Sequence, residues 1–491
     1  MSKAIPLYQE VAQRLEETIA TGVYEPGERL PSIRDIHREF QVSINTAREA
    51  YRLLEDRGIV NPRSHSGHFV LRLPPLCDDC SMDFPDPAES IPRDASAGSL
   101  TQRVMQDCMR PGWVNLATAE PPAALLPARR LADLTAKELR RQPERAVSYE
   151  LPPGPEVLRL EIARRLFRGS VSVSPDQILI TAGCLEAVFL SLMTVCSPGD
   201  SVVIESPGFF LFYQLLEKLR LQAIEIPSRP STGVDPEDLD QILTDAERRR
   251  QRGVGPKVAA AVLIANFSNP IGSLIPIERK RRIAAVLERH EVILVEDDMY
   301  GEMAWNVERP PSLASFTDPN RTLLCASFSK SIAPGYRVGW IATGPTLIGP
   351  VTHSKLVTSA AVVIPTSLGI AAFLANGGHE RWLRSARRHY RESVSQVRRA
   401  VLESFPQGTQ MTNPAGGMVI WIVLPPQINV TEVYEQVRRE QICFAPGPMF
   451  TLSGNYRNCM RVNATKWDST VEAAIKAIGS AACRTADRTG P

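Results

Sequence analysis

One lysine stands among residues that suit covalent chemistry. Lys330 follows the short β-rich run 323–328 and comes directly after Ser329. A lysine amine can form a Schiff base with an aldehyde, and small hydroxyl residues beside it can bind phosphate oxygens. Ser327 or Ser329 could supply those hydroxyl groups, and Arg337 could add a charged fork. A lysine in a loop is ordinarily only a solvated charge, so its neighbours carry the prediction.

Acidic residues follow a second apolar run. The stretch 291–295 is predicted to be a buried strand, and Glu296, Asp297 and Asp298 come directly after it. Acids at the carboxyl end of a parallel strand point into the crevice where α/β sheets bind ligands. Burying a carboxylate is costly unless a cation compensates it, and a protonated pyridine nitrogen would do so. The alternative is an acidic turn on the surface.

A glycine turn offers a place for an anion. Gly183 separates the β-rich run 177–181 from the helical stretch 185–195. The free N–H groups and the dipole of a helix N-terminus favour a bound anion, although packing alone could explain a single glycine turn. A lysine, a carboxylate and an anion-binding turn are together what a pyridoxal 5′-phosphate site needs.

The segments that carry these residues alternate between apolar strands and amphipathic helices, which is typical of an α/β fold. The chain has 491 residues, too many for one ordinary domain. Its content of 43% hydrophobic and 22% charged residues is that of a globular protein in water. Because the formal net charge is only +2, any nucleic-acid binding must come from a local patch.

The cysteines and the start of the chain bear on location. The nine cysteines lie mostly inside apolar runs and are typical of reduced cytoplasmic thiols. The first residues lack an apolar signal core, and no apolar run reaches bilayer length. We therefore expect a cytoplasmic chain without membrane contact.

Cys77 and Cys80 have CxxC spacing but no second pair, so we expect no metal site and interpret them as a chance pair in a linker.

The N-terminal residues follow a helix-turn-helix pattern. Apolar residues recur every fourth position and predict a first helix (Leu7, Val11, Leu15 and Ile19). A second helix opens at Pro31, and a third, 43–58, begins at the N-cap residue Ser43. A hairpin wing over 59–71 follows the third helix.

Charge alone does not decide what this N-terminal unit binds. Acidic and basic residues balance in residues 1–74, so a helical domain that binds nothing remains possible. The distribution of charge is more informative, because Arg34 and Arg48 lie on the second and third helices. Arginines there could hold phosphates and reach base edges in the major groove.

Residues 6–70 resemble the DNA-binding domain of GntR-family regulators, through the runs EPGERLPSIRDI, VSINTAREAYRLLEDRGIV and SGHFV. The resemblance implies binding to double-stranded operator DNA. The residues it implies for this role are Arg34, Ser43, Asn45, Thr46 and Arg48, with Gly67 shaping the wing tip. Ile44 stands where the family often has Arg, and His65 where a wing glycine is usual, so the operator sequence is not predicted.

From about residue 112 to 479 the chain resembles fold-type I aminotransferases, and most closely the aminotransferase-like half of MocR-type regulators, a GntR subfamily. The most specific motif is SFSKSIAPGYRVGW, residues 327–340. The resemblance implies that Lys330 forms the Schiff base, that Asp297 pairs with the pyridine nitrogen, and that Arg461 grips the carboxylate of an amino acid. The other cofactor-binding residues it implies are Tyr149, Gly183, Cys184, Phe209, Asn269, Tyr300, Ser327 and Arg337.

Two of these implied roles and two departures from the pattern bear on function. Phe209 matches a ring that stacks on the cofactor, and Tyr149 matches a tyrosine that reaches the phosphate of a neighbouring subunit, which implies a homodimer. Cys184 replaces the usual Ser or Thr near the phosphate, and Ala119 stands where glycine is common in the loop over the substrate. Neither departure touches the Schiff base.

These observations predict a fold and three open functions. Residues 1–74 form a winged helix-turn-helix, 75–111 a flexible linker, and 112–485 an aminotransferase-like domain with a large, mostly parallel α/β lobe and a smaller α+β lobe. The chain could be a regulator that senses an amino acid or amine by aldimine chemistry, a working aminotransferase with a DNA-binding head, or a sensor of pyridoxal phosphate. The head favours a regulator with at most vestigial turnover, and Arg461 favours a carboxylate-bearing effector.

Overall fold

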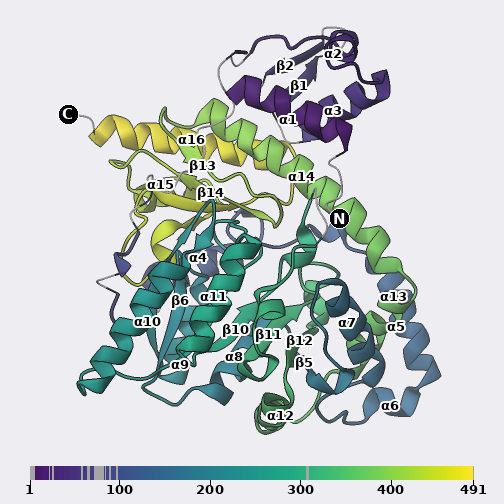
Figure 1. Cartoon of the computed structure of the whole chain (residues 1–491), viewed down its shortest axis with the longest axis vertical. Coiled ribbons are helices and arrows are strands. Elements are labelled where there is room, and N and C mark those ends of the chain that lie inside the picture. The colour runs from purple at the N-terminus through teal and green to yellow at the C-terminus, as the bar shows by residue number, and fades with distance from the viewer. Residues whose placement is uncertain are drawn as a thin grey trace. The chain divides into compact units, whose positions relative to one another are not determined.

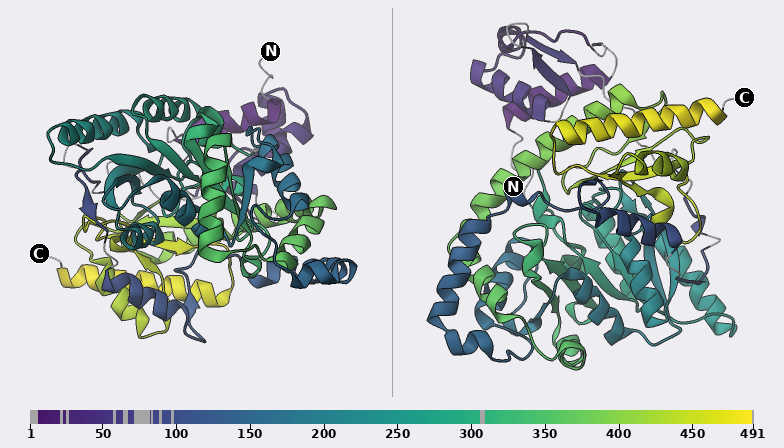
Figure 2. Two further views of the ribbon diagram at one scale, coloured as in Figure 1. Left: turned by 90° about the horizontal axis from the view of Figure 1, so that it is seen from below. Right: turned by 180° about the vertical axis from the view of Figure 1, so that it is seen from behind.

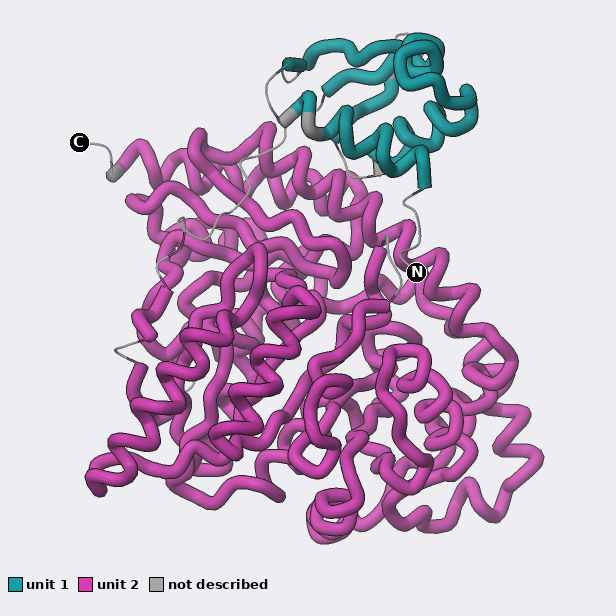
Figure 3. Tube along the Cα trace, in the orientation of Figure 1, with its two compact units in different colours: residues 1–76 teal, residues 77–491 magenta. Residues whose placement is uncertain are grey.

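The computed structural model describes residues 6–20, 23–24, 27–56, 59–63, 67–70, 82, 84–87, 90–95, 98–305 and 309–489. They divide into two compact units, residues 1–76 and 77–491 (Figure 3). The predicted positions His65, Cys77 and Cys80 lie outside the described residues. None of the helices in the described part of the chain combines the length and apolar character that crossing a bilayer requires.

The first unit is a winged helix-turn-helix, as predicted. Its elements are α1 (Leu7–Ala20), α2 (Ile33–Glu39), α3 (Ile44–Asp56) and the antiparallel hairpin of β1 (Val60–Arg63) and β2 (Gly67–Val70). Ser32 caps α2 by accepting from the backbone N–H of Asp35 at 3.2 Å, and Ser43 accepts from that of Thr46 at 3.0 Å. These caps fix where the two helices begin, and therefore the short turn between them.

The second unit is built around one large sheet (Figure 1). Its strands, in spatial order, are β3 (Arg93–Asp94), β7 (Gln222–Arg229), β6 (Ser201–Ser206), β9 (Val258–Leu263), β10 (Ile293–Asp297), β11 (Thr322–Ser327), β12 (Gly339–Thr343) and β5 (Ile178–Thr181), and β8 (Gly233–Val234) pairs with β7. The central strands from β7 to β11 pair in parallel, whereas β3 and β8 run antiparallel to β7, and β12 runs antiparallel to both of its neighbours. Strands such as β6, β11 and β12 are buried along their whole length because helices cover both faces.

Alternate residues of the central strands pack on different helices. One face supports α8 (Cys184–Val195), α9 (Phe210–Leu219) and α12 (Pro345–Ser359). Other positions on the same strands pack on α10 (Pro236–Gln251) and α11 (Ile277–Arg289), which lie side by side in Figure 1. The helices α5 (Ala128–Arg141), α6 (Pro143–Val147), α7 (Glu156–Arg168) and α13 (Ile364–Ala375) gather at the β5 end of the sheet.

A smaller α+β lobe completes the second unit. Its antiparallel sheet has the order β13 (Gln410–Met411), β14 (Val419–Val423), β17 (Cys459–Asn463) and β16 (Ala445–Pro446), and β15 (Ile442–Cys443) pairs in parallel with β4 (Val114–Asn115). Its helices are α4 (Ser99–Cys108), α14 (Gly378–Ser404), α15 (Val430–Arg438) and α16 (Ser469–Thr489). The long helices α14 and α16 lie side by side in both figures (Figure 2). The predicted fold class is confirmed.

The expected linker is shorter than 75–111. Ser90 is buried and donates from its hydroxyl to the carbonyl oxygen of Glu225 at 2.8 Å, and β3 pairs with β7. The helix α4 buries Val104 against the core of the small lobe. The physical reason is an apolar stripe at every fourth residue (Leu100, Val104, Cys108), which packs as one helix face.

Candidate functional site

Three predicted residues come from separate elements and line one cavity of about 290 Å³. Asp297 ends β10, Lys330 follows the end of β11, and Arg461 lies on β17 of the small lobe. The other predicted residues around this cavity are Cys184, Phe209, Asn269, Tyr300, Ser329 and Arg337. The cavity lies beyond the carboxyl ends of parallel strands, where α/β sheets bind ligands.

The amine of Lys330 is held by backbone rather than by a carboxylate. Its Nζ donates to the carbonyl oxygen of Ala119, in the loop that follows β4. Burial lowers the pKa of Lys330 to about 8, because a desolvated ammonium is disfavoured and the nearby charge of Glu120 only partly offsets this effect. A lysine of this kind carries a useful fraction of neutral, nucleophilic amine near neutral pH.

This pKa predicts how the reactivity of Lys330 depends on pH. Only the neutral amine attacks an aldehyde, so the rate at which Lys330 reacts with an added aldehyde such as pyridoxal phosphate should rise about tenfold per pH unit and level off above about pH 8. Stopped-flow absorbance would measure this rate, with N-acetyl-lysine methylamide as the matched free amine. A protein whose rate keeps rising to the same high pH as the free amine would contradict the lowered pKa.

Asp297 is buried between two donors. Its Oδ1 accepts from the backbone N–H of Met299 at 3.0 Å and from the thiol of Cys184 at 3.3 Å. Burial raises the pKa of Asp297 to about 6, so the carboxylate form needs a cation beside it. Cys184, expected from the resemblance to lie near a phosphate, therefore also contacts the carboxylate.

The turn before α8 and Arg337 form an anion cradle. Gly183 has φ of +100°, and a Cβ at this position would collide with the guanidinium of Arg337. Arg337 donates to the carbonyl oxygen of Ala182 at 2.7 Å and to the hydroxyl of Ser329 at 3.3 Å. The open helix N-terminus, a hydroxyl and a guanidinium meet here, and this donor set fits a phosphate group.

Arg461 lies on the opposite side of the cavity. Its guanidinium donates to Asn269 Oδ1 at 2.8 Å and to the carbonyl oxygen of Ala117, and it lies 5.2 Å from the ring centre of Phe450. Within the described residues its buried Nε has no hydrogen-bond partner. Burial lowers the pKa of Arg461 to about 10, which still leaves it charged. A buried guanidinium with an unused donor suits a carboxylate ligand.

Besides Gly183, two predicted residues do not line the cavity. The hydroxyl of Ser327 donates to Met299 Sδ at 3.1 Å and accepts from the backbone N–H of Ser329 at 3.2 Å, so it orders the loop before Lys330. Tyr149 is 86% exposed in the single chain. Its role toward a neighbouring subunit stays a prediction.

Sequence reasoning placed Ala119 in the loop over the substrate but missed the contacts of this loop with both cationic residues. The carbonyl oxygens of Ala117 and Ala119 accept from Arg461 and Lys330. Asn115 orders this loop, because its Oδ1 accepts from the backbone N–H groups of Ala117 and Thr118 at 3.0 Å each. Backbone carbonyls leave no signal in residue type, so nothing in the sequence marks these two hydrogen bonds.

Glu302, two residues after Tyr300, lies at the centre of a group of buried charged residues. It accepts from Arg165 Nε at 3.0 Å and Nη2 at 2.7 Å. Arg387 of α14 donates to the carbonyl oxygen of Glu302, and Arg309 lies 4.0 Å from its carboxylate. Burial alone would raise the pKa of Glu302, but Arg165 and the other nearby cations lower it to about 2.

The predicted DNA-binding residues share the surface of the first unit. Arg34, Ser43, Asn45 and Arg48 are exposed, and Arg48 Nη1 lies 3.4 Å from Asn45 Oδ1. Thr46 is half-buried, with its hydroxyl 2.8 Å from that of Ser43. Gly67 opens β2 with φ of +99°, a conformation that favours glycine at the wing.

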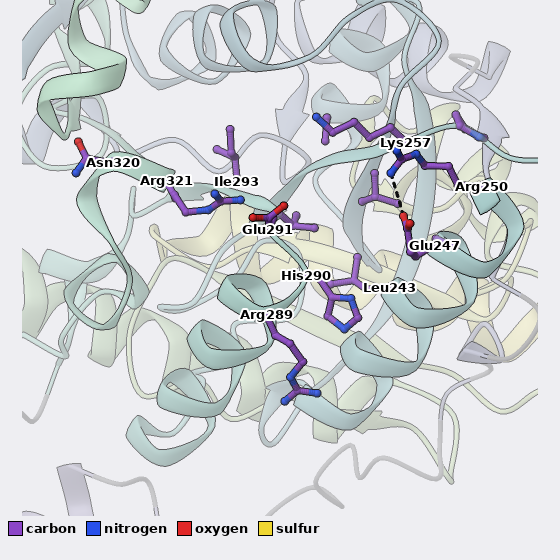
Figure 4. A pocket seen from close by; sticks show the side chains of 15 residues that line it. Leu243, Glu247, Arg250, Lys257, Arg289, His290, Glu291, Ile293, Asn320 and Arg321 are labelled. Carbon is purple, nitrogen blue, oxygen red and sulfur yellow. Dashed lines mark hydrogen bonds and ion pairs between the residues drawn. The ribbon is translucent and has the colours of Figure 1, made fainter.

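A larger cavity, of about 600 Å³, lies at the amino ends of β9, β10 and β11 (Figure 4). Three of its basic residues have local partners: Arg250 pairs with Glu247 at 3.2 Å, and Arg289 and His290 both contact Asp240, at 2.9 and 2.7 Å. These residues lie around the C-terminal ends of α10 and α11, where positive charge compensates the helix dipole. The residues described around it include none of the predicted ones, so the smaller cavity is the candidate site.

Comparisons with known proteins agree with this architecture. Residues 7–70 match the family of bacterial regulatory proteins named gntR, and residues 111–478 match aminotransferase class I and II. Two uncharacterized HTH-type transcriptional regulators of Escherichia coli are similar over nearly their whole length. YjiR is 35% identical over 97% of this chain and 99% of its own, and YdcR is 32% identical over 96% and 98%.

The second unit also has relatives among solved structures. A multiple substrate aminotransferase from Thermococcus profundus superposes with a TM-score of 0.72 at 24% identity, over 82% of this chain and 98% of its own. This likeness supports the fold. The chain belongs to the GntR family of bacterial regulatory proteins and, within it, to the MocR-type regulators, in which a winged helix-turn-helix is fused to an aminotransferase-like domain.

Proposed function

We propose that this regulator binds pyridoxal 5′-phosphate covalently through Lys330 and responds to an amino acid or amine that enters the same cavity. The observation that carries the proposal is the convergence of Lys330, Asp297 and Arg461 on one cavity, beside the anion cradle at Gly183 and Arg337. Lys330 and Arg461 both line this cavity, and in this proposal they hold different ends of one small molecule. When bound, pyridoxal phosphate supplies an aldehyde that reacts reversibly with primary amines.

Each residue has a defined task in this proposal. Arg337, Ser329 and the N-terminus of α8 bind the phosphate, and Asp297 holds a proton on the pyridine nitrogen. The raised pKa of Asp297 fits this task, because a pyridinium would supply the cation that the buried carboxylate needs. Lys330 supplies the amine, and Phe209 supplies a ring beside the cofactor. Tyr149 reaches a second copy of the chain in a homodimer.

Sensing requires that the ligand bind two conformations of the protein with different affinity. Arg461 belongs to the small lobe and Lys330 to the large one, so a ligand held by both favours the closed arrangement of the lobes. We propose that this closure changes operator binding by the first unit.

The visible spectrum of the cofactor-loaded protein tests this function. The protein is titrated with a panel of amino acids and amines while its affinity for DNA is followed by fluorescence anisotropy. A spectral change that stops at a stable bound form, together with a change in DNA affinity, is expected. Repeated turnover with release of a keto acid and no change in DNA affinity would instead identify an aminotransferase.

The role of Arg461 predicts a ligand-specific defect. The Arg461→Ala variant should need about 30-fold more of the responding amino acid, because a charged hydrogen-bonded pair contributes about 2 kcal/mol. The matched control is the decarboxylated amine of the same side chain, which should respond equally with both proteins. Equal losses for the amino acid and the amine would argue against a carboxylate contact. The measurement is the titration of the visible band.

The recognition helix predicts a defect confined to DNA binding. Arg48→Ala should weaken binding to a duplex selected from random sequence by the wild-type protein about tenfold, while cofactor loading stays unchanged. Arg14→Ala, at an equally exposed arginine on α1 that pairs with Glu10, is the matched control. Unchanged affinity of Arg48→Ala at physiological salt would mean that another surface meets the DNA.

A further inference from the structure

Two free cysteines lie in contact behind the loop that faces Lys330 and Arg461. Cys108 is the last residue of α4 and Cys443 the last of β15, and their Sγ atoms are 3.7 Å apart. Both thiols are free. A disulfide bond is about 2 Å long, so the two sulfurs need to approach by less than 2 Å to form one.

The two cysteines differ in access and in acidity. Cys443 is fully buried, whereas Cys108 is half-buried and therefore partly exposed to solvent. The hydrogen bond with Cys108 lowers the pKa of Cys443, and the backbone N–H groups of Leu116 and Ala117 add to this effect. The same hydrogen bond raises the pKa of Cys108. An unequal pair of this kind supplies one thiolate as nucleophile and keeps the other thiol as its partner.

The pair is connected directly to the cavity loop. Asn115 donates to the carbonyl oxygen of Cys108 at 3.5 Å, and its Oδ1 lies 3.8 Å from Cys443 Sγ. The same Oδ1 orders the backbone of Ala117. The carbonyl oxygen of Ala117 accepts from Arg461, and the charge of Arg461 also acts on the Cys108 thiol. A movement of either sulfur is therefore expected to shift Asn115. Through Asn115 it would also shift the backbone of Ala117, which contacts Arg461.

We propose that Cys108 and Cys443 form a reversible disulfide that makes the effector cavity sensitive to hydrogen peroxide. One thiolate attacks a peroxide oxygen and the O–O bond breaks; the hydroxide that leaves takes up the proton released from that thiol, so a sulfenic acid and water form. The second thiol attacks that sulfur, the S–O bond breaks, and a second water leaves with the remaining proton. Two electrons pass from the sulfurs to the peroxide, and a dithiol returns them by exchange.

Disulfide formation stands independently of the proposed function, whereas its effect on ligand binding rests on that function. Cys196 and Cys483 are half-buried like Cys108, and among the described residues neither hydrogen-bonds to another cysteine. They serve as matched control positions. Cys77 and Cys80 are both replaced by serine in the background protein. These two thiols, which lie three residues apart in the sequence, then cannot form a disulfide of their own.

The experiment treats the reduced, cofactor-loaded background protein with hydrogen peroxide. Peptide mass spectrometry then identifies cross-linked peptides, and hydrogen exchange reports on residues 114–119. We expect a linked peptide pair containing Cys108 and Cys443, its reversal by dithiothreitol, and at least a threefold change in exchange across the loop. Cys108→Ser should abolish both effects and Cys443→Ser should do the same, whereas Cys196→Ser and Cys483→Ser should leave both unchanged.

Each other outcome overturns part of the proposal. Failure of the wild-type pair to link under peroxide, with Cys196 or Cys483 oxidised instead, would reject the disulfide. A bond that forms without any change in loop exchange would reject its coupling to the cavity. Because Cys108 is half-buried, Cys108→Ser keeps the test valid should Cys443→Ser fail to fold. A reduced protein without a visible cofactor band would reject the proposed function alone, since the mass measurement does not depend on cofactor.

Discussion

Replacing Lys330 by alanine is expected to abolish the visible absorption band of the cofactor-loaded protein. The amine of Lys330 is the group placed to bond with the aldehyde, and its pKa of about 8 keeps part of it neutral at physiological pH. The variant should stay folded, because the lost hydrogen bond to the carbonyl oxygen of Ala119 is one of many contacts of that loop. Absorption spectroscopy and circular dichroism would measure the two effects.

Two controls separate the chemistry of Lys330 from its charge. Lys330→Arg keeps a cation able to donate to Ala119 but removes the primary amine, so it should also lose the band. Lys257→Ala, at the larger cavity, should keep the band fully. A band that survives in Lys330→Ala and Lys330→Arg would assign the covalent bond to another lysine.

Replacing Glu302 by glutamine is expected to destabilise the second unit by about 3 kcal/mol. Its pKa of about 2, against 4.5 for an ordinary glutamate, corresponds to a stabilisation of that order by the surrounding arginines. The variant leaves the guanidinium of Arg165 without its closest carboxylate, which lies 2.7 Å away. Glu380→Gln is the matched control, because Glu380 is 43% exposed and should change stability by less than about 1 kcal/mol.

The sign of the pH dependence follows from the lowered pKa. The contribution of Glu302 is fully present above about pH 4.5 and is lost as the pH falls toward about 2. The difference in free energy of unfolding between the wild type and Glu302→Gln should therefore shrink to less than half at about pH 3. Urea denaturation at several pH values would measure it. A difference that stays constant with pH would mean that the loss is one of packing and not of charge.

The cofactor side of the cavity could be predicted from the sequence because each of its parts is local. A strand, a glycine turn and a helix place Gly183 at an anion site within a few residues. A strand followed by an acid, and a strand followed by a lysine, place Asp297 and Lys330 at the same edge of the sheet. Local patterns of this kind survive folding unchanged, since neighbours in sequence determine them.

The partners of Arg461 and of Glu302 could not be predicted, because they come from residues distant in the sequence. Ala117 meets Arg461 through a backbone carbonyl, and Glu302 meets Arg387 across different elements. Neither pairing has a spacing that could reveal it. The helix α4 is a different case, because its apolar stripe was present in the sequence, but the many Pro, Asp and Ser residues before it favoured a linker.

The helix α14 gives the second unit a mechanical property. Its 27 residues form a rod about 40 Å long. Arg387, in its first half, donates a hydrogen bond to the carbonyl oxygen of Glu302. Val394, Val397 and Val401, further along the helix, belong to the core of the small lobe. A rod held in this way acts as a lever: a tilt of about 5° along its full length would displace one end by roughly 3 Å. A small rotation of α14 near Glu302 would therefore move the far end of the helix by a larger distance.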